Sequence, residues 1–176
     1  MEKPYIGDWA ISSWNAQGLL ASSIERQQQK LWRARCLAAT QDIVVLQETH
    51  GNKGKCRGLR TAKGLMPFWS NGPGGEAGVG AWVKEEFLRK FDSGGGGHRW
   101  IPDVVPGRAA ILRCWSSEGK LQIGMVYLHT GHSGGRAERL DTLQRLVAEL
   151  EAWGRALTII TGDFNFVVDK MDRISR

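Results

Sequence analysis

The sequence predicts a single layered α/β domain, and three observations support that prediction. The 176 residues are the length of one domain, long enough to bury a core without metals or disulfides. Short β-rich runs are bounded by Gly, Ser or Pro, and several of them are apolar throughout. Two longer segments carry apolar residues at helical spacing. Because a strand that is apolar on both sides must be covered on both faces, the pattern indicates sheets enclosed by helices.

The predicted strands follow the chain in six runs. They are 9–15, 42–47, 78–83, 109–115, 121–128 and 157–162. β-Branched and aromatic residues fill these runs, and turn-forming residues flank them, as is typical of strands.

The predicted helices lie between these runs and are amphipathic. The first covers about 22–39, with its apolar face formed by Ile24, Leu31, Ala34 and Ala38. The second covers about 136–153, with one stripe formed by Leu140, Leu143, Val147 and Leu150. Gly154 follows as a C-terminal stop signal. Such stripes are ordinary core positions, so both helices are interpreted as structural.

Two Gly- and Pro-containing segments, 49–77 and 91–108, are predicted to be loops. The four glycines at 94–97 are predicted to form a very flexible loop tip. The first of these segments is also strongly basic. It contains Lys53, Lys55, Arg57, Arg60 and Lys63, with no acidic residue from Thr49 to Gly75. This pattern fits a surface that holds a nucleic-acid backbone, and it equally fits a solvated basic loop.

Composition restricts the partner and the compartment. The formal net charge of +6 favours a polyanionic partner. Cys36, Cys56 and Cys114 are an odd number without metal-ligand spacing, which indicates reduced thiols and an intracellular protein, nuclear or cytoplasmic. No stretch approaches the roughly 18 apolar residues of a membrane span, so no membrane partner is expected.

Polar residues stand where three of the predicted strands end. Asn15 ends the first, Glu48 follows the second, and Asp163 and Asn165 follow the last. If these strands lie side by side in one sheet, their carboxyl ends bring these side chains to a common rim. A small set of oxygen ligands that leaves room for water and a phosphate suits Mg²⁺ better than zinc or copper.

The motifs WNAQG, LQETH and TGDFN, in this order, resemble the signature blocks of the endonuclease/exonuclease/phosphatase superfamily. The resemblance implies that residues 1–176 belong to one domain of the deoxyribonuclease-like type, a four-layer α/β sandwich that hydrolyses phosphoesters with Mg²⁺, or alternatively Mn²⁺. By the same resemblance, Glu48 is the metal ligand and Asn15 supports the metal and the phosphate. Asp163 orients or activates the attacking water, and Asn165 contacts the scissile phosphate.

The stretch IGMVYLHTGH matches two branches of this superfamily at once. Tyr127 matches the phosphate-contacting tyrosine of abasic-site and retrotransposon endonucleases. His129 matches the proton-transfer histidine of deoxyribonucleases, although an ordinary surface histidine remains the alternative. His132 is interpreted as a surface residue.

The tail favours one branch. Asp172, Arg173 and Ser175 after GDFN resemble non-LTR retrotransposon endonucleases, and the resulting expectation is a DNA endonuclease of retroelement type, with RNA as an alternative substrate. Two other functions stay open: a phosphatase or sphingomyelinase of the same superfamily, and a non-catalytic nucleic-acid-binding remnant.

The resemblance also implies that a C-terminal part is missing. Family members carry a Ser-Asp-His-like block and further strands after GDFN, whereas this sequence stops at Arg176. It is expected to be an excerpt, a degenerate product, or a chain completed by another subunit. The incomplete sheet is expected to favour self-association, and the chain alone to show little or no nicking of plasmid DNA.

Overall fold

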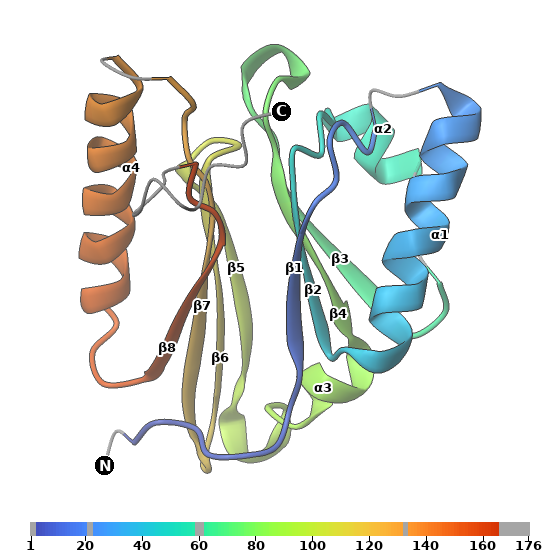
Figure 1. The fold of residues 1–176 in the computed structure, drawn as a ribbon. Coiled ribbons are helices and arrows are strands. Elements are labelled where there is room, and N and C mark those ends of the chain that lie inside the picture. The colour runs from blue at the N-terminus through green and yellow to red at the C-terminus, as the bar shows by residue number, and fades with distance from the viewer. Residues whose placement is uncertain (1–2, 21–22, 59–61, 132–133, 166–176) are drawn as a thin grey trace, which may run out of the picture.

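The computed structural model describes residues 3–20, 23–58, 62–131 and 134–165. Its two four-stranded sheets stack face to face, with one long helix covering the outer face of each (Figure 1). The predicted four-layer α/β sandwich is therefore confirmed. The first sheet has the order β1-β2-β4-β3 and the second β5-β6-β7-β8.

The bounds of the strands in the first sheet are Ile11–Asn15 for β1, Ile43–Gln47 for β2, Leu65–Ser70 for β3 and Val79–Lys84 for β4. Those in the second are Gly97–Val105 for β5, Ala109–Ser116 for β6, Gly119–Tyr127 for β7 and Leu157–Asp163 for β8. The helices are Ile24–Thr40 for α1, Lys53–Gly58 for α2, Glu85–Arg89 for α3 and Gly134–Glu151 for α4. Short 3₁₀ turns cover Pro73–Gly75 and Ser93–Gly95.

Three apolar layers separate the four layers of backbone, and strand β2 shows how the sequence builds them. Ile43 and Val45 face the other sheet, where they pack with residues such as Leu112. Val44 and Leu46, on the opposite side of the same strand, pack beneath α1. A third cluster, containing Ile111, lies between the second sheet and α4. Alternation along a strand that is apolar on both sides thus fills two cores at once.

Two parallel strand pairs determine where the functional residues meet. β1 pairs in parallel with β2, and α1 connects them. β7 pairs in parallel with β8, and α4 connects them. In Figure 1 the carboxyl ends of β1, β2 and β8 all lie at the same end of the sandwich.

The prediction that 49–77 and 91–108 are loops was wrong. The first contains α2 and β3, and the second contains all of β5. Both missed strands carry a proline, Pro67 and Pro102, and both lie at a sheet edge, where proline is tolerated because one side of the strand needs no donor. The glycine-rich stretch is also not a free tip, because Gly96 donates to Ser93 O and Gly97 begins β5.

The predicted helix faces were partly wrong. Ala34 and Ala38 of α1 are buried, but Ile24, in the first turn, is 74% exposed. In α4 the buried face centres on Leu146 and Leu150. Leu140 and Val147 lie on the flank of that face and are exposed, because β8, the strand beneath this flank, is the outermost strand of its sheet. Gly154 has the left-handed φ of 78° expected of a helix stop.

Among the described helices, none combines the length and apolar character that a membrane crossing requires.

Candidate active site

Asn15 joins the two predicted carboxylates at the end of the sandwich. Its side-chain amide donates one hydrogen bond to Glu48 Oε1 at 2.7 Å and another to Asp163 Oδ2 at 2.8 Å. The expectation that the three strands share one sheet was wrong, since β1 and β2 belong to one sheet and β8 to the other. The rim therefore spans both sheets, and the Asn15 amide bridges the gap between them.

The backbone at this rim is held in uncommon conformations. Gln17, Glu48 and Asn165 have φ values of 48°, 52° and 49°, in the left-handed region that non-glycine residues seldom occupy. Gln17 N–H donates to Asn15 Oδ1 at 3.0 Å, which fixes the orientation of that amide. Such conformations persist only where the surroundings impose them, and they gather at functional sites.

Asn165 is tied to both neighbouring strands. Its backbone N–H donates to Asp163 Oδ1 at 3.0 Å, and its side-chain amide donates to Leu128 O at 2.6 Å. Each carboxylate oxygen of Asp163 therefore accepts a hydrogen bond, one from Asn165 and one from Asn15. These bonds fix the plane of the carboxylate.

Arg108 is a site residue that the sequence reasoning missed. Its guanidinium lies 4.6 Å from the centre of the Tyr127 ring. Burial raises the pKa of Tyr127 above the ordinary 10.0, the charge of Glu48 and a hydrogen bond with that carboxylate raise it further, and Arg108 opposes these effects. Tyr127 is thus a protonated phenol that contacts Glu48 at neutral pH. A glycine-arginine turn directly before a buried strand was the available signal.

His129 lies beside this group, one position after the buried Leu128. Its Nε2 is 3.8 Å from Glu138 Oε2, and its backbone oxygen accepts a hydrogen bond from Arg139. Burial and then the charge of Arg108 lower the pKa of His129 below the ordinary 6.5, while Glu138 opposes the shift. The imidazole is therefore neutral at pH 7, as a proton acceptor must be.

The predicted basic stretch divides between two places. Lys53 and Lys55 are exposed on α2, which lies at the same end of the sandwich as the carboxylates (Figure 1). Lys63 lies elsewhere, in a hollow that also contains Lys84, beyond the start of β2. The basic stretch as a whole therefore does not border the rim. Only the helical backbone of Arg57 is described.

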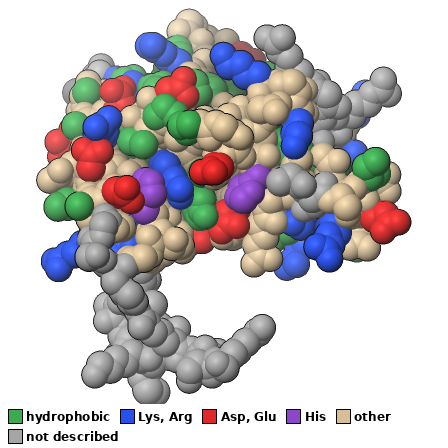
Figure 2. All heavy atoms as spheres, turned by 90° about the horizontal axis from the view of Figure 1, so that it is seen from above, with side chains coloured by type: hydrophobic (Ala, Val, Ile, Leu, Met, Phe, Trp, Pro, Cys, Tyr) green, Lys and Arg blue, Asp and Glu red, His purple; other side chains and the backbone are tan. Residues whose placement is uncertain are grey.

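Other predicted residues lie outside the described ranges: Arg60, His132, Asp172, Arg173 and Ser175. Seen from the carboxylate end, the surface shows acidic, basic and histidine side chains close together (Figure 2).

The donors at the rim fit a hard divalent cation. A hollow of about 630 Å³ is lined by the ends of β1 and β8, including Asn15 and Asp163. Within the described ranges, no group of three or more His, Cys, Asp or Glu side chains is close enough to form a ligand cage. Mg²⁺ needs no such cage, because it keeps several waters and takes one or two carboxylates together with substrate phosphate. Glu48 and Asp163 are the carboxylates available at the rim.

The two stacked sheets with helices on their outer faces form the deoxyribonuclease-like α/β fold to which the motifs WNAQG, LQETH and TGDFN point. Comparison with known families agrees, since residues 12–175 match the Endonuclease/Exonuclease/phosphatase family. The chain belongs to this family, whose members are generally phosphodiesterases and nucleases. The predicted superfamily membership is thus confirmed. A search of curated protein sequences finds no match.

Solved structures show the same fold. D. rerio TDP2, complexed with single strand DNA product, is 21% identical with a TM-score of 0.62, over 90% of this chain and 61% of that one. The endonuclease domain of TRAS1, a telomere-specific non-LTR retrotransposon, is 13% identical with a TM-score of 0.57, over 91% and 62%. The human Nocturnin catalytic domain, with bound sulfate anion, is 17% identical with a TM-score of 0.55, over 90% and 64%. The chain spans less than two thirds of each of these structures.

Proposed function

We propose that this domain, taken as residues 1–176, is the catalytic core of a Mg²⁺-dependent phosphodiesterase that cleaves DNA, an endonuclease of the retroelement type. One observation carries this proposal: the Asn15 amide holds the Glu48 and Asp163 carboxylates together across two sheets. An ordinary domain has no need of two partly exposed carboxylates fixed in this way. Mn²⁺ is the alternative cation and RNA the alternative substrate.

Each residue of the rim has a proposed part in the reaction. Asp163, whose oxygens are held by Asn15 and Asn165, accepts a proton from the attacking water and orients it. Asn165 donates to one non-bridging phosphate oxygen, and Tyr127, whose hydroxyl contacts Glu48 in the free protein, turns to donate to another when the substrate binds. Arg108 places a permanent positive charge beside them. His129 is neutral and can accept a proton.

Glu48 would hold the cation, with the oxygen of Asn15 beside it. When bound, Mg²⁺ supplies charge neutralisation at the phosphate and at the leaving oxygen. Glu48 is well placed for this because its carboxylate is fixed by Asn15 and Tyr127 rather than by a lysine or arginine that would neutralise it.

Three features favour nucleic acid over a small phosphate ester as the substrate. The chain has a net charge of +6, which favours a polyanion. The exposed Lys53 and Lys55 lie on α2 near the rim. Similar folds include a TDP2 complexed with single strand DNA product and the endonuclease domain of a retrotransposon.

The decisive experiment is hydrolysis with a panel of substrates. Supercoiled plasmid, inositol polyphosphates and sphingomyelin are incubated with residues 1–176, expected to cleave little or nothing, and with a form extended through a Ser-Asp-His-like block, each in Mg²⁺ and, separately, in EDTA. Nicking of plasmid that needs Mg²⁺ and disappears with Asn15→Ala supports the proposal. Hydrolysis of inositol phosphates or sphingomyelin instead would assign the rim to another activity of the family. DNA binding without cleavage of any substrate would indicate a binding remnant.

Replacing Lys53 and Lys55 together by alanine is expected to weaken DNA binding about equally for all sequences, since phosphate contacts carry no sequence information. The slope of log K against log salt for duplex DNA should become shallower by about 0.9 for each phosphate that the variant no longer neutralises. Fluorescence anisotropy at several salt concentrations measures this slope. The control is the double substitution of Arg145 and Arg155, exposed at and beyond α4. An unchanged slope in the α2 variant would leave Lys53 and Lys55 as a solvated surface.

The pKa of His129, measured by NMR titration of its ring protons, is expected below 6.5. Arg108→Gln should raise it, because the guanidinium opposes protonation. Since the folded-state pKa is below the unfolded value, His129 contributes stability above about pH 6.5 that is lost as the pH falls below it. Arg145→Gln is the control. A His129 pKa that stays unchanged in Arg108→Gln would contradict the effect of the Arg108 charge on His129.

A further inference from the structure

A second hollow, which is basic, lies at the end of the sandwich opposite the carboxylates. Its volume is about 370 Å³, within the range of small-molecule sites. Strand β4 runs antiparallel to β2, so Lys84 lies beyond the start of β2, while Glu48 follows its end. With five residues in β2, the two sites are separated by roughly 15–20 Å along the strand. The hollow is therefore distinct from the rim.

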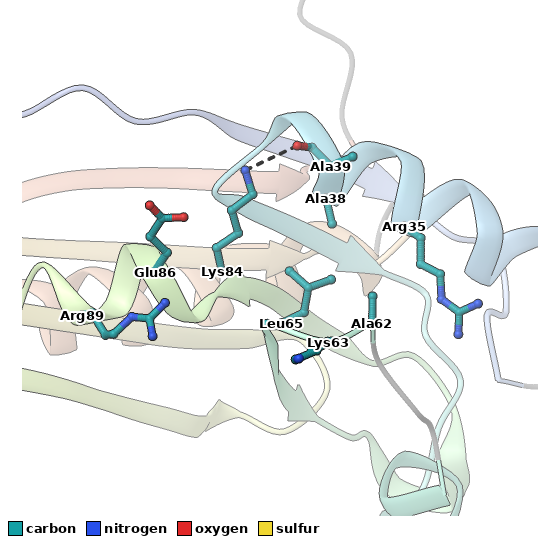
Figure 3. A pocket seen from close by; sticks show the side chains of 10 residues that line it. Arg35, Ala38, Ala39, Ala62, Lys63, Leu65, Lys84, Glu86 and Arg89 are labelled. Atoms are coloured by element: carbon teal, nitrogen blue, oxygen red, sulfur yellow. Dashed lines mark hydrogen bonds between the residues drawn. The ribbon is translucent and has the colours of Figure 1, made fainter.

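Four cationic side chains from three elements and a loop surround this hollow: Arg35 of α1, Lys63 before β3, Lys84 of β4 and Arg89 of α3 (Figure 3). Lys84 donates to Ala39 O at 3.5 Å and pairs with Asp42 at 3.9 Å, which fixes its position. Glu86 is the acidic side chain in the lining. With four cations against Glu86 and the paired Asp42, the hollow is net positive.

Small side chains leave room between these cations. Ala38, Ala39 and Ala62 line the hollow together with Leu65, so its floor is apolar while its margin is charged. A site of this kind accepts a ligand with both a flat or apolar part and negative charges, and a nucleotide has both.

An exposed tryptophan precedes the lining residues of α1. Trp32 is 67% exposed, and it lies three residues before Arg35 and seven before Ala39, which places all three on one side of the helix. A large aromatic side chain left in solvent beside cations is the arrangement on which unpaired bases stack while their phosphates contact lysine and arginine.

We propose that this surface, Trp32 with the hollow beside it, binds single-stranded nucleic acid. A base stacks on Trp32, and the neighbouring phosphates contact Arg35, Lys63 and Arg89. Duplex DNA fits less well, because its bases are already stacked on each other and offer no free face to the tryptophan. The site would hold a strand away from the carboxylate rim, and it acts by binding alone.

The test is binding of a fluorescein-labelled 12-nucleotide oligothymidylate, followed by anisotropy in EDTA. The Lys53→Ala/Lys55→Ala background reduces binding at the carboxylate end. Trp32→Ala is expected to weaken the affinity at least about fivefold, because one base loses its stacking contact. Trp32→Phe should recover part of it. Arg35→Ala and Arg89→Ala should each reduce the salt slope by about 0.7. Ile24→Ala, exposed on the same helix, and Arg145→Ala, on α4, are matched controls.

Photocrosslinking gives a second, independent readout. An oligonucleotide carrying 5-iodouracil should crosslink to the tryptic peptide of residues 31–33, which contains Trp32. Crosslinks restricted to other peptides, or equal binding by wild type and Trp32→Ala, would overturn the proposal. An acidic peptide is also tested as a competitor. If it displaces the oligonucleotide and binds equally well to wild type and Trp32→Ala, the hollow belongs to a protein partner and the proposal is overturned. Plasmid nicking is measured separately, so failure of the proposed catalytic function is distinguished from failure of this site.

Discussion

In a form extended through a Ser-Asp-His-like block, replacement of Glu48 by alanine is expected to lower Mg²⁺-dependent DNA cleavage about 10²- to 10⁴-fold, the usual cost of removing one catalytic group. The substitution removes the acceptor of the Asn15 hydrogen bond and the partner of the Tyr127 hydroxyl. It also removes one of the two carboxylates available to a cation at the rim. Little stability should be lost, because Glu48 is only half-buried.

Two measurements separate the metal from the reaction. Mn²⁺ titration followed by electron paramagnetic resonance reports cation binding without any need for cleavage, and single-turnover nicking of plasmid reports the reaction. Glu48→Gln keeps an oxygen that can accept from Asn15 but removes the charge, so it should also lose Mn²⁺. Glu85→Ala, an exposed carboxylate of α3 at the far end, is the matched control. Unchanged Mn²⁺ affinity in Glu48→Ala would contradict its assignment to the metal.

The candidate site could be predicted from local sequence to the extent that each residue is tied to a strand end. Asn15, Glu48 and Asp163 follow apolar β-runs, and the three do meet at one end of the sandwich. Their distribution between two sheets could not be predicted in this way. Strand pairing depends on contacts between distant segments, and the spacing within each motif is the same for either arrangement.

The missed parts of the fold share a cause. Pro67 and Pro102 were interpreted as loop signals, but edge strands tolerate proline, and whether a strand is at an edge is known only once the sheet is assembled. Arg108 was missed because it follows a proline-glycine turn. The fold places it over Tyr127 because Tyr127 N–H donates to Arg108 O across the start of β6.

The charge pattern was informative about function but not about position. Lys53 and Lys63 belong to one basic stretch of the sequence, yet α2 and β3 carry them to opposite ends of the domain. A run of like charges indicates a polyanionic partner, and only the fold separates one contact surface from two.

The largest structural effect is expected from Gly162→Ala, which should lower the free energy of unfolding by about 3–5 kcal/mol. Gly162 has a φ of 145°, a conformation that is rare for any residue with a side chain. An added Cβ would lie 1.9 Å from Val126 O, which is backbone of the neighbouring strand β7. Val126 is fully buried, so β7 cannot move away without disturbing the core beneath α4.

The same substitution should also disturb the site, since Asp163 is the next residue. The backbone oxygen of Asp163 accepts a hydrogen bond from Leu128 N–H. Guanidinium unfolding followed by circular dichroism measures the stability, and Mn²⁺ titration of the folded protein measures the site. Gly131→Ala is the matched control, because its φ is 101° but nothing described lies within 4 Å of the added Cβ. It should cost only about 1–2 kcal/mol of backbone strain. Equal destabilisation by the two substitutions would show that β8 does not approach β7 at Gly162 as closely as the structure indicates, and the position of Asp163 at the rim would then be in doubt.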